Sequence, residues 1–160
     1  MSKLDMLYKL AEKHEIWVDY ADLQKHQPGL LGLYALDEQD GPIILLDSRL
    51  EDRPRLHVCV LAEEIAHHLE GVRTSLNTVY AVWLRQPYHN EVIKMRQDEN
   101  RALKRACDLI FPDWEWWEGI RQGVRSYHEM AEFAQVTEWF ARKKHYFMQL
   151  EGRIRERRGA

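Results

Sequence analysis

The residues best suited to chemistry lie in one short stretch, Glu63-Glu64-Ile65-Ala66-His67. On a helix, Glu63 and His67 are four residues apart and project from one face, so a carboxylate and an imidazole can bind the same cation. Glu64 points slightly aside, where its carboxylate can take a proton from a water molecule beside the cation. The pattern is that of a zinc-peptidase motif in which Glu replaces the usual first His.

A carboxylate in the first ligand position changes the expected chemistry. An anionic ligand donates more charge to the cation than a neutral His, so the attacking water should be acidified less. Carboxylates also suit harder ions such as Mn2+. We therefore expect zinc (Zn2+), with Mn2+ or another divalent ion as the alternative, in a site of reduced Lewis acidity. A slow or narrowly triggered enzyme would follow.

The surrounding residues predict a buried helix that carries this motif. Pro54 suits its first turn, it should run to about Glu70, and Gly71 is its stop signal. Apolar residues spread around the helix: Leu56, Val58, Val60, Leu61, Ile65 and Leu69. Two carboxylates and two histidines are costly in such surroundings, and a divalent cation would compensate for them. The alternative is that the carboxylates are solvated and His67 is a hydrogen-bonded helix histidine.

The wider stretch 60–68, Val-Leu-Ala-Glu-Glu-Ile-Ala-His-His, closely resembles the Leu-Ala-Glu-Glu-Leu-Gly-His-His form of the ImmA/IrrE metallopeptidase family. Members with this form come from Gram-positive bacteria and their prophages. The family's third ligand is a Glu in a later pattern like Glu-x-x-Ala-x-x-x-Ala-x-x-Leu-Leu-x-Pro. Residues 99–112 match that spacing throughout, which makes Glu99 the third ligand and leaves Asp98 as its rival. Ala66 departs from the pattern, where Gly is usual.

The residues themselves also suit this assignment. Three protein ligands with one open position are what a catalytic zinc ion needs. A second long helix is predicted over residues 91–110, stopped by Pro112, and the small residues Ala102 and Ala106 would let it approach the motif helix closely. The motifs do not identify the residue that would stabilise the tetrahedral intermediate. Candidates come from the loop predicted over 72–90, each also explicable as a loop or packing residue: Tyr80, Tyr88 and His89.

The remaining patterns predict an α+β fold, because a helix comes first, then strands, then helices. The expected early elements are a helix over 3–14, an extended piece at 16–18, and strands over 30–36 and 43–46 that form a small antiparallel sheet. The resemblance implies that these build a zincin-like metallopeptidase core, with an active-site helix and a second ligand-bearing helix. We place that core at residues 1–112.

Residues 113–150 are expected to form a helical C-terminal unit, helix-turn-helix-like and packed on the core. Ser126 opens a capping box with Glu129, and Thr137 can cap the last helix. Four of the six Trp residues fall in this region and should cement its helices to the core; the alternative is an exposed Trp114–Trp117 surface for a protein partner. Residues 151–160 read as a basic, frayed tail.

Bulk properties restrict the function classes. The net charge of −3 argues against a nucleic-acid binder, so we do not expect direct DNA binding. No stretch approaches the roughly 20 apolar residues of a membrane helix, and the N-terminus lacks a signal-peptide pattern, so we expect a cytoplasmic protein with no membrane partner. Cys59 and Cys107 are too few for a disulfide framework; we interpret them as reduced, buried small residues, with a redox or metal role as the alternative.

Function follows from the resemblance. It implies a zinc-dependent endopeptidase that cleaves a helix-turn-helix transcriptional repressor and so derepresses prophage, mobile-element or stress genes. Glu63, His67 and Glu99 would hold the metal, and Glu64 would activate the water. One alternative is a module that binds a repressor or antitoxin-like partner without cleaving it. Another is a DNA-binding regulator, which would retain duplex DNA in a salt-dependent way.

Overall fold

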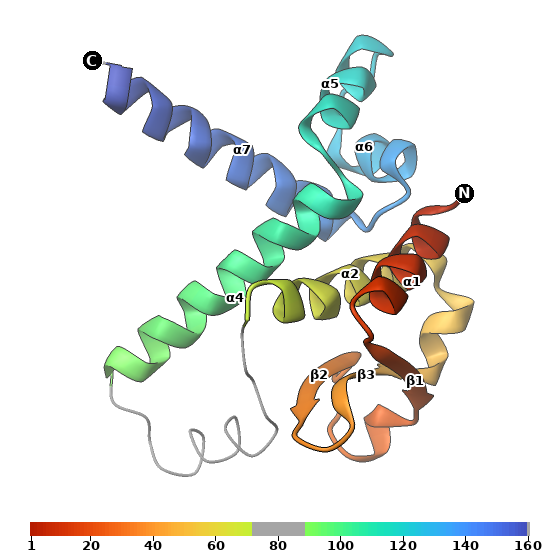
Figure 1. Cartoon of the computed structure of the whole chain (residues 1–160). Helices are drawn as coiled ribbons and strands as arrows, with labels where there is room; N and C mark the ends of the chain where they lie inside the picture. Colours follow the sequence, from red (N-terminus) through yellow and green to blue (C-terminus); the bar gives the residue numbers. More distant parts are fainter. Residues whose placement is uncertain (72–88, 160) are drawn as a thin grey trace.

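The computed structural model describes residues 1–71 and 89–159, and Figure 1 shows how their elements are arranged. This part of the chain has six α-helices and a three-stranded sheet, so the predicted α+β class is confirmed. The helices are α1 (Lys3–Lys13), α2 (Pro54–Leu69), α4 (His89–Ile110), α5 (Asp113–Arg121), α6 (Tyr127–Ala134) and α7 (Glu138–Gly159). The strands are β1 (Trp17–Ala21), β2 (Gly32–Asp37) and β3 (Gly41–Asp47), with short 3-10 helices at Leu23–Lys25 and Ser48–Asp52.

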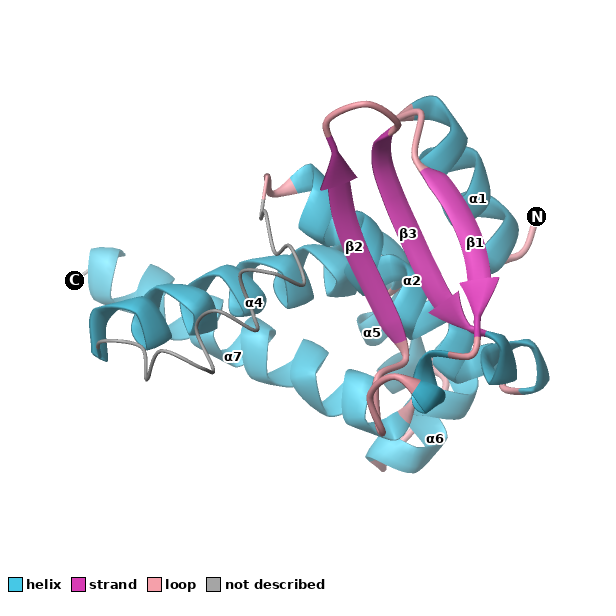
Figure 2. Ribbon diagram, turned by 90° about the horizontal axis from the view of Figure 1, so that it is seen from below, coloured by secondary structure: helices cyan, strands magenta, loops and turns pink. Residues whose placement is uncertain are grey.

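The sheet is mixed, so the prediction of a wholly antiparallel sheet is wrong. Its strand order is β1-β3-β2, with β2 antiparallel to β3 and β1 parallel to β3. A tight hairpin joins β2 to β3: the Asp37 carboxylate accepts hydrogen bonds from the backbone of Gln39 and Asp40, and Gly41 has a φ of +82°. After β1 the chain crosses over to start β2 at the far edge, so β3 returns in the middle, parallel to β1. Figure 2 shows the three strands from the face opposite α1 and α2.

Helix α2 is the central element of the fold. It packs against α1, against β2 and β3, and along α4. Pro54 occupies its first turn, and the chain leaves it through Gly71 at a φ of +66°, as the stop signals predict. More than half of its residues are buried, which confirms the expected apolar surroundings. The same continuous core includes Ile44 of the sheet and Phe140 of α7.

Small residues line the contact between α2 and α4. Ala62 and Ala66 on α2, and Ala102 and Ala106 on α4, are all fully buried. Without longer side chains between them, the two backbones can approach closely. The burial of Ala102 and Ala106 agrees with the prediction that small residues let α4 approach α2 closely.

The C-terminal helices join the same core through several specific contacts. Ser126 and Glu129 form the predicted capping box of α6, and the Thr137 hydroxyl accepts a hydrogen bond from Phe140 at the start of α7. Lys144 of α7 is buried and pairs with Asp108 of α4 at 3.1 Å and with Asp113 of α5 at 2.5 Å. Helix α7 continues to Gly159, so residues 151–159 are its last turns.

The tryptophans of this region only partly fill their predicted packing role. Trp116 is buried, as expected. Trp114, Trp117 and Trp139 are 69%, 60% and 53% exposed, so the prediction that they cement the helices to the core is wrong. For Trp114 and Trp117 the reason is that α5 is amphipathic, with Trp116 as its one buried Trp; Trp139 lies in the first turn of α7. None of the helices in the described residues combines the length and apolar character of a bilayer-spanning helix.

The α2–α4 contact predicts the effect of enlarging one alanine. Ala102→Leu should lower the free energy of unfolding by about 1–3 kcal/mol, because the added carbons have no space between the helices. The midpoint of urea unfolding, followed by circular dichroism, measures this. Asn100→Leu, at an exposed position of the same helix, is the matched control and should change stability little. Equal midpoints for the two variants would contradict the close packing.

Candidate metal centre

The candidate metal centre lies where α2 and α4 meet. Glu63 and His67 are one turn apart on α2, and Glu99 comes from α4. One ligand atom from each of these three residues lies within 4.8 Å of the other two. His67 Nε2 is 3.6 Å from Glu99 Oε2. The structure thus brings together the three residues that were predicted as metal ligands.

This donor set suits a divalent cation. Zinc bonds of about 2.0–2.2 Å to nitrogen and oxygen put tetrahedral ligand atoms roughly 3.4 Å apart. The His67–Glu99 distance of 3.6 Å is already close to that spacing. Two carboxylates and one imidazole leave a coordination position open, as a catalytic site requires, and they also accept harder ions such as Mn2+.

Burial and nearby negative charge make the Glu63 and Glu64 carboxylates hard to ionise. Burial raises the pKa of Glu63 to about 7, and the nearby Glu99 carboxylate adds to the effect. The pKa of Glu64 rises to about 8, first because of burial and then because of Glu63 and Glu99, while a hydrogen bond from the Tyr34 backbone opposes the rise. A cation among these groups would stabilise their charged forms.

The surroundings of His67 disfavour its protonated form. It is buried, and burial lowers its pKa, while the Glu99 carboxylate acts in the opposite direction. A neutral imidazole has a lone pair available for a metal, and Nε2 is the ring nitrogen that faces Glu99. Its other nitrogen, Nδ1, has no hydrogen-bond partner among the described residues.

Strand β2 holds Glu64 from the side of the sheet, which the sequence patterns did not indicate. Gly32 lies so close to α2 that a Cβ atom there would be 2.9 Å from Glu64 Oε1 and 2.7 Å from Val60 Cγ1. The backbone of Tyr34 makes the hydrogen bond that stabilises the ionised Glu64. A glycine inside a predicted strand was the available signal, because it often marks a close approach of another segment.

Tyr34 also contacts the residue after His67. Its hydroxyl is 3.0 Å from Nδ1 of His68, and the two rings pack edge to face. The ring of His14, just after α1, also packs edge to face with the ring of His68. These contacts fix the end of α2 beside the centre.

Other predicted site residues lie elsewhere. The Asp98 carboxylate pairs with Arg101 on α4 and does not belong to the ligand cluster. Tyr80, Tyr88 and the side chain of His89 lie outside the residues that the structure describes.

The two cysteines are buried thiols. Burial raises the pKa of Cys59 to about 11 and that of Cys107 to about 12, so both remain protonated at neutral pH. The Thr137 backbone N–H lies 3.5 Å from the Cys59 sulfur and donates to it. This arrangement supports their interpretation as small core residues.

Comparisons with protein-family models, with curated proteins and with solved structures found no match for this chain.

The raised pKa values predict how the metal-free protein responds to pH. In the folded state the pKa values of Glu63 and Glu64 are about 7 and 8, whereas in the unfolded chain both have the ordinary value of 4.5. Both carboxylates therefore bind protons more tightly in the folded state. Their contribution to stability is therefore fully present below the unfolded pKa and is lost as pH rises through the folded values. Stability in the presence of a chelator should fall between about pH 5 and pH 8.

Urea unfolding across that pH range provides the measurement. The double variant Glu63→Gln/Glu64→Gln removes both titrations and should show a flatter dependence. Excess zinc should flatten the wild-type curve, because the cation favours the ionised carboxylates. If the stability of the double variant depends on pH as steeply as that of the wild type, other groups cause the dependence.

Proposed function

We propose that this protein is a metallo-endopeptidase of the ImmA/IrrE type, with zinc held by Glu63, His67 and Glu99. The observation that carries the proposal is the cluster of these three side chains at the α2–α4 contact, with Glu64 beside it. The resemblance of residues 60–68 and 99–112 to the family supports the same ligand set. The geometry adds that ligands from two separate helices come close enough to share one ion.

Peptide hydrolysis gives each residue a defined task. The water oxygen attacks the carbonyl carbon while Glu64 takes a proton from the water. Glu64 then gives that proton to the leaving amine nitrogen as the carbon–nitrogen bond breaks, which leaves a carboxylic acid and an amine. When bound, the cation supplies Lewis acidity that lowers the pKa of water and stabilises negative charge on the carbonyl oxygen.

The surroundings of Glu64 suit a group that must carry a proton between two positions. Its carboxylate is flanked by Gly32 and by the Tyr34 backbone, so its orientation is restricted. A fixed base avoids the entropy cost of finding the attack geometry in each turnover. We infer that β2 positions Glu64 and that α2 and α4 position the ligands.

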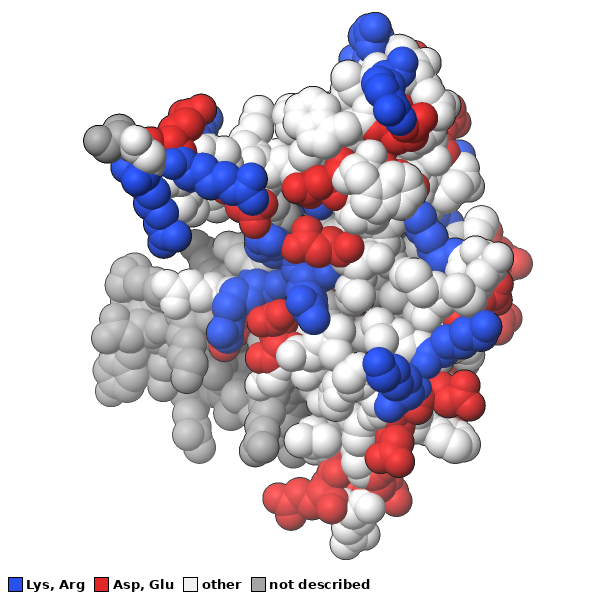
Figure 3. Space-filling model, turned by 45° about the horizontal axis from the view of Figure 1, so that its top comes forward, with Lys and Arg blue, Asp and Glu red and all other residues white. Residues whose placement is uncertain are grey.

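The substrate proposed from the resemblance is a helix-turn-helix transcriptional repressor, cut to release prophage, mobile-element or stress genes. Basic and acidic side chains are interspersed over much of the face in Figure 3, whereas Arg residues predominate at the end of α7. We place the recognition of the repressor in protein–protein contacts, and the repressor encoded beside the gene is the first substrate to test.

The proposal predicts the outcome of a cleavage assay with that repressor. The zinc-loaded protein should produce discrete fragments, which mass spectrometry identifies. Glu64→Gln should slow cleavage by about 10²–10⁴-fold, the usual contribution of a general base, while zinc remains bound. Stable complex formation with an intact repressor would contradict the peptidase proposal and favour the binding module.

The ligand assignment has its own matched pair of variants. Glu99→Gln should lower both zinc content and cleavage, because it removes a charged ligand. Asp98→Asn, at the neighbouring position of the same helix, should leave both unchanged, since Asp98 pairs with Arg101. Zinc content is read by elemental analysis of protein purified without a chelator or a His-tag. The reverse pattern would make Asp98 the ligand.

A further inference from the structure

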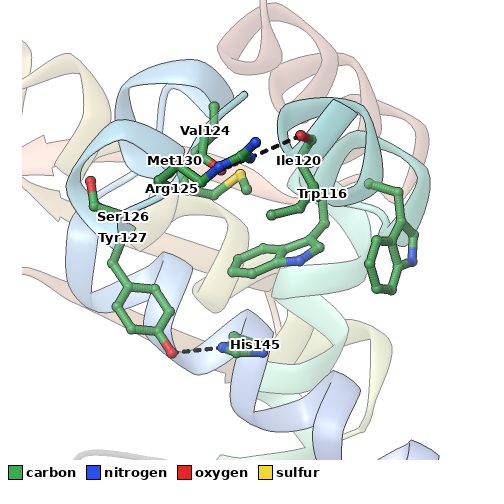
Figure 4. Close-up of a pocket in the computed structure, with 9 residues that line it drawn as sticks. Trp116, Ile120, Val124, Arg125, Ser126, Tyr127, Met130 and His145 are labelled. Carbon is green, nitrogen blue, oxygen red and sulfur yellow. Dashed lines mark hydrogen bonds between the residues drawn. The ribbon is translucent and has the colours of Figure 1, made fainter. Parts of the chain in front are cut away.

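A second concave site lies among α5, α6 and α7. It is a pocket of about 410 Å³ that shares no residue with the candidate metal centre. Figure 4 shows the side chains that surround it. Its walls carry four aromatic or imidazole rings, from Trp116, Trp117, Tyr127 and His145. Three aliphatic or thioether side chains complete its apolar part: Ile120, Val124 and Met130. Its volume falls in the usual range for small-molecule sites, about 300–1,000 Å³.

Contacts among the wall residues hold the pocket in shape. The rings of Trp116 and His145 are stacked, with centroids 4.9 Å apart and planes inclined by 22°. The Tyr127 hydroxyl is 2.6 Å from His145 Nδ1, which ties α6 to α7. Gly119 of α5 lies so close to Met130 that a Cβ atom would be 2.8 Å from its sulfur. Packed helices therefore form most of the cavity wall, and the short α5–α6 connection supplies Val124, Arg125 and Ser126.

Apolar side chains at the mouth of the pocket are exposed to solvent. Trp117 is 60% exposed and Ile120 is 38% exposed, although both line the pocket. Exposed aromatic surface beside a concave site is typical of ligand recognition. Flat rings make their best contacts with other flat rings, so the walls favour a planar aromatic ligand.

The charge of the pocket selects the polar end of that ligand. Among the described residues that line it, Arg125 is the one Lys, Arg, Asp or Glu side chain. Its Nη1 atom donates to the backbone carbonyls of Val124 and Ile120 at 3.1 and 3.4 Å, which holds the guanidinium beside the pocket (Figure 4). Glu129 accepts from the backbone N–H groups of Arg125 and Ser126 at 2.8 and 3.0 Å, so its carboxylate is directed to the backbone.

We propose that this pocket binds a small aromatic carboxylate. The ring system would lie against Trp117 and the stacked Trp116–His145 pair, and the carboxylate would accept hydrogen bonds from Arg125. A guanidinium is suited to this role because its planar donors match the two carboxylate oxygens. The site is separate from peptide hydrolysis and does not depend on the proposed function.

Calorimetric titration of the full chain with 2-naphthoate tests the proposal. Saturable 1:1 binding is expected. Trp117→Ala should weaken it roughly tenfold through loss of the aromatic wall. Trp114→Ala is the matched control, since Trp114 is also exposed on α5 but does not line the pocket, and it should leave the affinity unchanged. Equal losses in both variants, or no saturable binding, would overturn the proposal.

A second pair of measurements tests the carboxylate. Arg125→Gln should weaken 2-naphthoate about ten- to a hundredfold, as expected for a hydrogen bond to a charged group, and should not affect neutral 2-naphthamide. Intermolecular nuclear Overhauser effects from ligand protons to the Trp117 indole locate the ligand in the wild-type chain without any substitution. If neither the Arg125 nor the Trp117 substitution changes the affinity for 2-naphthoate, the ligand binds elsewhere, for example at the metal centre. That result would contradict the assignment.

Discussion

The structure depends on the placement of three carboxylates where the buried helix α2 meets α4. Glu63 and Glu64 lie on the largely buried helix α2, and Glu99 approaches them from α4. Burial, together with repulsion from neighbouring carboxylates, makes the ionised forms of Glu63 and Glu64 unfavourable and raises their pKa values to about 7 and 8. A divalent cation is the simplest group that removes both penalties, because it neutralises the repulsion and replaces the lost water as a partner.

The rest of the fold serves this contact. Alanines on both helices allow the backbones to approach, and β2 closes the third side with a glycine that leaves room for Glu64. The C-terminal helices fix the other end of α4, where buried Lys144 pairs with Asp108. Regular elements therefore position Glu63, His67 and Glu99, and a metal site needs such support because ligand positions must be held to a fraction of an ångström.

Local sequence signals predicted the helices and their ends well. Pro54, Gly71 and the Ser126–Glu129 capping box act through nearby backbone groups, so their effect can be read from neighbouring residues. The proximity of Glu99 to α2 was predicted only through the family spacing, because no local pattern joins residues more than thirty positions apart. The β1–β3 pairing and the Gly32 contact depend on long-range geometry, and the exposed Trp117 depends on which side of α5 faces the core.

Zinc-edge anomalous diffraction from crystals grown with zinc would locate a bound ion without reference to activity. We expect one dominant anomalous peak bonded to Glu63, His67 and Glu99, with a coordination position left for water. A peak at another group, such as the neighbouring pair His14 and His68, with none among these three residues, would contradict it.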